Sequence, residues 1–415
     1  METRSIPRQD QEEGELVGTA DLVVGFLTEF DPDAIASVCD ALRTLSGSPR
    51  IAVLQSGSGN PGPAQPDVAE GRSASVYFVP TPLATPVATG GALVDIFAAY
   101  RSVFAASQKL GARACCVLAS KYELATPRWS YQLAQALLED DQDLVVPRYA
   151  GQKFKGLLNS CIVSPLTRSL YGKRIRNPMG PDLGVSRRIF EWVLGAERPS
   201  DTGGVHPLAS LASTALCNNL KVCEVHLGAR IYPSIDWESI SSLLAQVLAP
   251  IFLDMERNAA CWQRVRGSVP VPVIGDPPFA SPDAENVDIR QMVESFQLGN
   301  RELQEIWGLV LPTATLFELR KLLRLSVEQF HMPDELWVRI VYDFALAHHL
   351  QTISRDHLLQ SVTPLYLGWV ASYAKDLQAT EGTTLEQRLE RLSSTYESAK
   401  PYLVSRWRWP DRFSP

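Results

Sequence analysis

Short apolar runs alternate with helix-forming stretches along the first third of the chain, and this alternation most constrains the fold. The apolar runs cover residues 21–27, 51–56, 76–80, 112–120 and 143–149. Between them, apolar residues recur with helical spacing in residues 31–45, 90–111 and 126–141. Such alternation predicts βαβ units and a mainly parallel sheet. Ligands bind at the carboxyl ends of the strands in such a sheet, so we expect a site in the loops that follow these runs.

A proline-rich segment divides the chain into two parts of different character. Residues 266–285 contain five prolines and show no helical period, so we interpret them as a linker. Beyond them, apolar residues recur three and four apart almost throughout, which indicates an all-helical domain. We expect Thr383 and Glu386 to form a capping box at one of its helices. The predicted layout is a disordered tail over 1–19, an α/β domain over 20–265, the linker, a helical domain over 286–405 and a tail over 406–415.

The charge balance and the hydropathy pattern exclude some classes of partner. The chain has 39 basic and 46 acidic residues, a formal net charge of -7. A protein that binds nucleic acid would normally show a basic balance, so we expect no such partner. No apolar run approaches the roughly 20 residues that span a bilayer, and the first residues lack the apolar segment of a secretory signal. A cytoplasmic location is therefore the expectation.

Seven cysteines are spread along the chain, and no two of them have the spacing of a CxxC motif. Most lie among apolar neighbours, as in the run ARACCVLAS. We expect them to be reduced and packed as small apolar side chains. Zinc sites and a disulfide framework are both disfavoured.

The most specific motifs lie between residues 153 and 184. The run reads KFKGLLNSCIVSPLTRSLYGKRIRNPMGPDLG. The pieces PLYLGW (364–369) and KPYLVSRW (400–407) accompany it near the end of the chain. Together they resemble family 2-like glycosyltransferases similar to mannosylglycerate synthase and, more distantly, to glucosyl-3-phosphoglycerate synthase. The likeness extends over about residues 20 to 407.

This resemblance implies a GT-A fold, in which a Rossmann-like, mainly parallel sheet domain precedes an all-helical C-terminal domain. Members of the group are often dimeric. They transfer a hexose from a nucleotide diphosphate sugar to a small acceptor, with Mg²⁺ or Mn²⁺ on the diphosphate. An anionic acceptor such as glycerate or phosphoglycerate suits this chain, because its densest basic stretch contains Arg174 and Arg176. The alternative interpretation of that stretch is a solvated helix end.

The positions that should hold the metal depart from the family pattern. The Asp-x-Asp columns, aligned on Thr126 and Trp129, contain Ala119 and Lys121 instead of carboxylates. The family's metal-binding histidine corresponds to Tyr232, and the nucleotide-contacting aspartate to Gly57. A lysine in the Asp-x-Asp column would repel a divalent cation. We therefore expect no metal cofactor, although the family as a whole would use one.

Two functions remain open on these residues. The first is a non-catalytic pseudo-glycosyltransferase that acts as a binding or regulatory module, as a homodimer or as the partner of an active relative. The second is a metal-independent hexosyltransferase in which Lys121 neutralises the diphosphate and Asp182 orients the sugar. In the second case Lys153 and Asn159 are the candidate donor-binding residues, and a nucleotide sugar is the expected ligand. For Asp182 the alternative role is to stabilise a turn.

Overall fold

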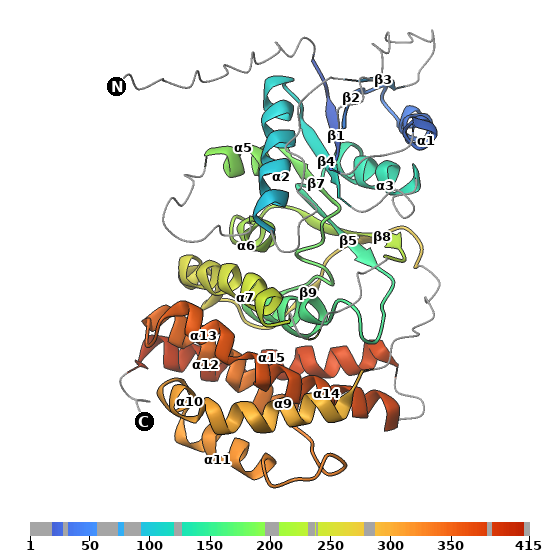
Figure 1. Cartoon of the computed structure of the whole chain (residues 1–415). Helices are drawn as coiled ribbons and strands as arrows, with labels where there is room; N and C mark the ends of the chain where they lie inside the picture. Colours follow the sequence, from blue (N-terminus) through green and yellow to red (C-terminus); the bar gives the residue numbers. More distant parts are fainter. Residues whose placement is uncertain are drawn as a thin grey trace, which may run out of the picture.

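The computed structural model describes ten segments of the chain. They are residues 19–27, 32–55, 74–78, 93–119, 127–195, 207–230, 237, 240–277, 287–379 and 384–410. A sheet with helices on both faces forms one end of the molecule, and a layer of helices forms the other, with α7 (Ile240–Arg257) between them (Figure 1). The predicted tail over residues 1–19 lies almost entirely outside the described residues.

The main sheet has eight strands in the order β10-β8-β5-β7-β4-β1-β2-β3. The strands are β1 (Leu22–Phe26), β2 (Arg50–Gln55), β3 (Ser75–Phe78), β4 (Ala114–Leu118), β5 (Leu144–Tyr149), β7 (Leu183–Ser186), β8 (Val222–Gly228) and β10 (Val273–Ile274). Strand β7 runs antiparallel to β4 and β5, and the other neighbours pair in parallel. A separate small sheet pairs β6 (Lys173–Arg174) with β9 (Val269–Pro270). The predicted mainly parallel sheet is confirmed.

Both faces of the main sheet are covered, which explains why its central strands are apolar throughout. On one face, α1 (Pro32–Arg43) and α3 (Pro127–Leu138) contribute to a core with Val24 and Cys116. On the other face, α2 (Leu93–Lys109), α5 (Arg187–Gly195) and α6 (Pro207–Cys217) contribute to a core with Val23 and Cys115. Figure 1 shows these helices on either side of the strands. Neighbours along one strand thus enter different cores, as strand geometry requires.

The rest of the described chain is mainly helical, and several helices that precede residue 266 contribute to its core. After a π-helical turn η1 (Asn159–Val163) come α4 (Ser164–Tyr171), α7 and α8 (Ala259–Trp262). The C-terminal helices are α9 (Ile289–Glu302), α10 (Gln304–Val310), α11 (Thr313–Leu322), α12 (Asp334–Leu350), α13 (Arg355–Ser361), α14 (Thr363–Ala379) and α15 (Leu385–Arg408). Side chains of η1, α4 and α7 share one apolar cluster with those of α12, α14 and α15. The all-helical C-terminal region is confirmed, whereas the exact domain boundaries stay predictions.

The capping box at the start of α15 lies one residue later than predicted. The Thr384 side chain accepts a hydrogen bond from the Gln387 N–H, and the Gln387 side chain accepts one from the Thr384 N–H. The run TTLEQ fits the capping-box pattern in two registers, which is why the sequence pointed to Thr383 and Glu386. Thr383 itself lies outside the described residues.

Two of the seven cysteines form a disulfide, contrary to the prediction that none would. Cys217 at the end of α6 is bonded to Cys261 in α8, with their Cα atoms 5.9 Å apart. These positions are 44 residues apart in sequence and have no spacing signature, so only the packing of α6 near α8 brings them together. The free cysteines are all buried, as expected; they are Cys39, Cys115, Cys116, Cys161 and Cys223.

In the part of the chain that the structure describes, no helix combines the length and the apolar composition that crossing a membrane requires.

Candidate functional site

The direction of β7 places Asp182 at the carboxyl edge of the sheet. Because β7 is antiparallel, it begins at the edge where β4 and β5 end, and Asp182 immediately precedes it. The side chain is 0 % exposed. Its Oδ1 accepts a hydrogen bond from the backbone N–H of Ala119 at 2.9 Å, and its Oδ2 accepts one from the Tyr149 hydroxyl at 2.5 Å. The carboxylate therefore joins the ends of three neighbouring strands.

Aromatic side chains and one arginine surround this carboxylate. The Tyr149 ring packs against Trp129, with 6.0 Å between centroids, and the Arg230 guanidinium lies 5.4 Å from the Tyr149 centroid. From α2, the Tyr100 hydroxyl donates a hydrogen bond to the carbonyl of Pro181. Burial, reinforced by the nearby charge of Asp182, raises the pKa of Tyr100 well above its usual range. Tyr100 therefore stays protonated and can keep donating to the loop.

The loop before Asp182 approaches β5 so closely that it needs a glycine. A Cβ added to Gly180 would lie 2.1 Å from Cγ of Pro147, a distance shorter than any permitted van der Waals contact. Asn159, the candidate donor-binding residue from η1, donates to the carbonyl of Arg176 at 2.8 Å and to Oδ1 of Asn177 at 2.9 Å. The amide of Asn159 thus holds the same loop in place.

A buried glutamate in β8 connects the sheet with the segment that follows α4. Glu224 is 0 % exposed, and burial raises the pKa of its carboxyl group. Its Oε2 accepts from Nη1 of Arg148 at 3.0 Å, and its Oε1 accepts from the backbone N–H of Arg176 at 2.5 Å. The Arg176 guanidinium extends the other way, and its Nη2 donates to Glu386 in the first turn of α15 at 2.8 Å. Arg176 therefore links the sheet to the helical region.

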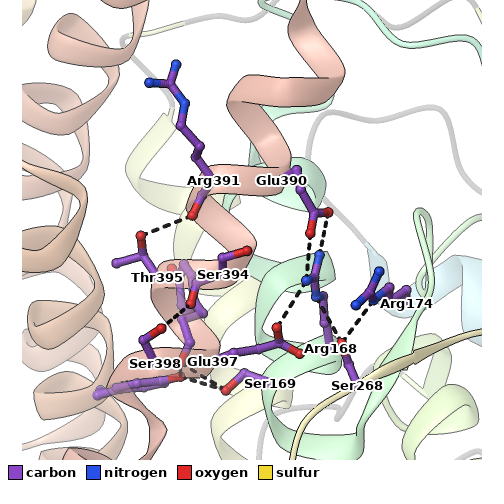
Figure 2. A network of polar contacts seen from close by, with 12 residues as sticks. Arg168, Ser169, Arg174, Ser268, Glu390, Arg391, Ser394, Thr395, Glu397 and Ser398 are labelled. Carbon is purple, nitrogen blue, oxygen red and sulfur yellow. Dashed lines mark hydrogen bonds and ion pairs between the residues drawn. The ribbon is translucent and has the colours of Figure 1, made fainter.

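The other basic residues of this stretch, Arg168 and Arg174, differ in exposure. Arg174 is exposed, and its Nε donates to Oγ of Ser268 at 3.1 Å. Arg168 donates to both carboxylate oxygens of Glu390, at 2.6 and 2.8 Å, and to Glu397 at 3.0 Å (Figure 2). Nε of Arg168 also donates to Oγ of Ser268, at 3.2 Å, so the buried Arg168 and the exposed Arg174 meet at one serine beside β9.

The candidate residues are therefore distributed as follows. Asp182 and Ala119 are in contact, and Asn159 contacts the backbone of Arg176. Lys153 follows β5 with an exposed side chain, and its carbonyl accepts a hydrogen bond from Tyr373 of α14 at 3.3 Å. Three positions named from the sequence lie outside the described residues; they are Gly57, Lys121 and Tyr232. The proposed roles of all these side chains stay predictions.

The described residues at the expected metal position do not fit a divalent cation. Ala119 ends in a methyl group, and both oxygens of Asp182 already accept hydrogen bonds from protein donors. Across the described segments, no three His, Cys, Asp or Glu side chains are arranged to hold a metal ion.

Sequence reasoning did not identify Tyr149, Arg230 and Glu224 as residues of this edge. The usable signal for Tyr149 and Arg230 was their position at or just after the carboxyl end of an apolar run, whereas Glu224 lies inside its strand and gave no such signal. The pairing of Tyr149 with Asp182 spans 33 residues in sequence and that of Glu224 with Arg176 spans 48, and no local pattern shows contacts of that range.

No protein-family model and no curated protein matches the chain. Among solved structures, two of glucosyl-3-phosphoglycerate synthase from Mycobacterium tuberculosis are each 17% identical, with a TM-score of 0.33. One is a complex with Mn²⁺, UDP-glucose and phosphoglyceric acid, and the other a complex with phosphoglyceric acid; each match covers 56% of this chain and 80% of that chain. A further mycobacterial protein is 18% identical, with a TM-score of 0.34, covering 57% of this chain and 74% of that chain. A likeness at this level does not identify an activity.

Proposed function

We propose that this chain is a glycosyltransferase-like binding module that takes a nucleotide sugar at the carboxyl edge of its sheet and does not transfer the sugar. The resemblance of residues 153–184 to family 2-like glycosyltransferases supports the ancestry and, with it, the GT-A interpretation of the sheet. The observation that supports the proposed loss of sugar transfer is the burial of Asp182 and the hydrogen bonds that its carboxylate accepts.

A carboxylate that orients a sugar or moves a proton must offer an oxygen to the substrate. Asp182 is completely buried, and its two oxygens are occupied by Ala119 and Tyr149. Because the carboxylate is 0 % exposed, a sugar hydroxyl could reach it only if the Ala119 N–H or the Tyr149 hydroxyl moved away from it. Leaving such a buried donor unpaired costs about 1–3 kcal/mol. This arrangement supports a structural role for Asp182.

The neighbouring side chains support ligand binding at the same edge. Arg230 is a half-buried cation beside the ring of Tyr149, and Trp129 packs on that ring. A guanidinium suits the phosphates of a nucleotide. The rings of Trp129 and Tyr149 are buried, 3% and 5% exposed, and support the arginine from below. A regulatory role, for example in pairing with an active relative, would use binding without turnover.

The test combines a transfer assay with a binding assay on the full chain. UDP-glucose or GDP-mannose is incubated with glycerate or 3-phosphoglycerate, once with Mn²⁺ and once with EDTA, and products are detected by mass spectrometry. We expect no product. In parallel, the same donors should raise the thermal midpoint in EDTA, because a ligand that binds only the folded state stabilises it.

Each other outcome has a defined meaning. Product formation in EDTA would establish a metal-independent transferase and direct attention to Lys121. Product formation that requires Mn²⁺ would show that the assignment of Ala119 and Lys121 to the metal columns is wrong. Absence of both product and thermal shift would overturn the binding part of the proposal. Arg230→Ala is the binding variant, and Arg113→Ala, an exposed arginine at the opposite end of β4, is its matched control.

A further inference from the structure

A cavity lies between the C-terminal half of α15 and the segment that follows α8. Its volume is about 470 Å³, and Arg266, Lys400, Arg408 and Trp409 are among its lining residues. It shares no residue with the carboxyl edge described above. Cavities of roughly 300–1,000 Å³ are typical of small-molecule sites.

The wall of this cavity is held by several independent contacts. Lys400 is 7% exposed, and its Nζ donates to the carbonyls of Leu170 at 3.0 Å and Val265 at 2.9 Å. Gly172, two residues after Leu170, adopts a positive φ of 71°. A Cβ at this position would lie 2.6 Å from Val265, so the close approach of the two segments requires glycine. The backbone N–H of Val269 donates to the carbonyl of Gly172, where β9 pairs with β6. The segment 265–269 is therefore fixed against α4 before any ligand arrives.

The charge of the lining is mainly positive. Three cations, Arg266, Lys400 and Arg408, face one carboxylate, Glu397, which already accepts a hydrogen bond from Arg168 at 3.0 Å. Burial, together with the nearby charge of Arg266, lowers the pKa of Lys400 to about 8 even though Glu397 opposes the shift. Bringing an anion into the cavity would relieve this excess of positive charge.

Two of these cations keep donors for a ligand. Within the described part of the chain, Arg266 is exposed and makes no hydrogen bond or ion pair. The one side-chain bond of Arg408 to the described residues runs from its Nε to Oε1 of Gln263 at 2.7 Å. The planar guanidinium groups present paired N–H donors, which match the oxygens of a phosphate group. Trp409 is 57% exposed and offers an apolar surface beside them.

We propose that this cavity binds a small phosphorylated molecule, with its phosphate held by Arg266 and Arg408 and its remaining part packed toward Trp409. Lys400 contributes charge and fixes the wall. The site does not depend on the proposed function at the carboxyl edge, so each can fail without the other.

Calorimetric titration of the full chain with inorganic pyrophosphate and with glucose 6-phosphate tests this proposal, and unphosphorylated glucose is the neutral comparison. We expect saturable binding of both phosphorylated probes, no binding of glucose, and weaker binding at higher salt. Arg266→Ala and Arg408→Ala should each weaken binding at least ten-fold, which corresponds to about 1.4 kcal/mol, because each removes charged donors from the phosphate.

The matched control is Arg264→Ala, which removes the same charge from an exposed side chain that does not line the cavity. It should leave the affinity within about two-fold of the wild type. Equal weakening by Arg264→Ala and Arg266→Ala would show that the overall charge attracts the anion, and would overturn the proposal. Absence of saturable binding to the wild type would overturn it as well. Arg230→Ala separates the two sites, because it should affect nucleotide sugars alone.

Discussion

Replacing Arg168 with methionine should destabilise the chain more than removing either of its acidic partners. Arg168 in α4 has a side chain that is 7% exposed, whereas Glu397 is 22% exposed and Glu390 55%. Removing one member of a buried ion pair costs about 3–5 kcal/mol when the remaining charge stays buried. Here water can solvate Glu390 but reaches Glu397 less well, so we expect a loss of about 3 kcal/mol in the free energy of unfolding.

The two acidic partners should differ in the same experiment. Glu390→Gln removes an exposed charge that water already screens, so its cost should stay below about 1 kcal/mol. Glu397→Gln should cost about 1–2 kcal/mol, since it weakens a charge-assisted hydrogen bond in a less exposed position. Figure 2 shows both carboxylates around the same guanidinium. The order Arg168→Met, Glu397→Gln, Glu390→Gln is therefore the expected ranking.

Urea unfolding followed by far-ultraviolet circular dichroism and by tryptophan fluorescence measures these differences. Coincident transitions from the two probes are required before a single free energy is assigned. A cost below about 1 kcal/mol for Arg168→Met would refute the reasoning, and so would a Glu390→Gln cost equal to it. The second outcome would mean that the exposed carboxylate carries the interaction.

Three further predictions address other parts of the chain. Thiol titration in denaturant without reductant should count five thiols, and a count of seven would contradict the pairing of Cys217 with Cys261. Reduction of this disulfide should lower the free energy of unfolding by about 4 kcal/mol, because the unfolded chain then loses a closed loop. Burial raises the folded pKa of Asp254 from 3.8 to about 6, so the wild type should lose about 3 kcal/mol of stability relative to Asp254→Asn as pH rises from about 3 to about 7. Parallel stability curves would exclude this effect. Gly180→Ala should lower the free energy of unfolding by about 1–3 kcal/mol, because the added Cβ would collide with Pro147. Urea unfolding measures this loss, and Gly195→Ala is the control, since a Cβ added there meets nothing within 4 Å.

The parts of the fold that local patterns encode could be predicted. The parallel strands are apolar because both faces of the sheet are buried, and that leaves a continuous signal in the sequence. Strand β7 has four residues and inserts between β4 and β5 in the reverse direction, so its partners are set by tertiary pairing alone. The same limit applies to the disulfide, whose two cysteines come from separate helices.

The candidate site shows the same division. Asp182 was identified from the resemblance of residues 153–184 to family 2-like glycosyltransferases, but its partners Ala119 and Tyr149 belong to other strand ends. Arg168 belonged to a basic stretch that fitted a solvated helix end, and α15, more than 200 residues later, covers it with Glu390 and Glu397. Whether a charged residue is exposed depends on what packs over it, and local spacing does not contain that information.

The apolar cluster shared by α4, α7, α12 and α15 has a consequence for how such a chain can change over time. Side chains from both halves of the sequence interdigitate there, so each half completes the interior of the other. Cutting the chain in the proline-rich segment would leave two water-exposed apolar faces. The helical layer is therefore not an independent folding unit that gene fusion could exchange. Changes of side-chain volume in α4 or α7 require compensating changes in the helices that cover them.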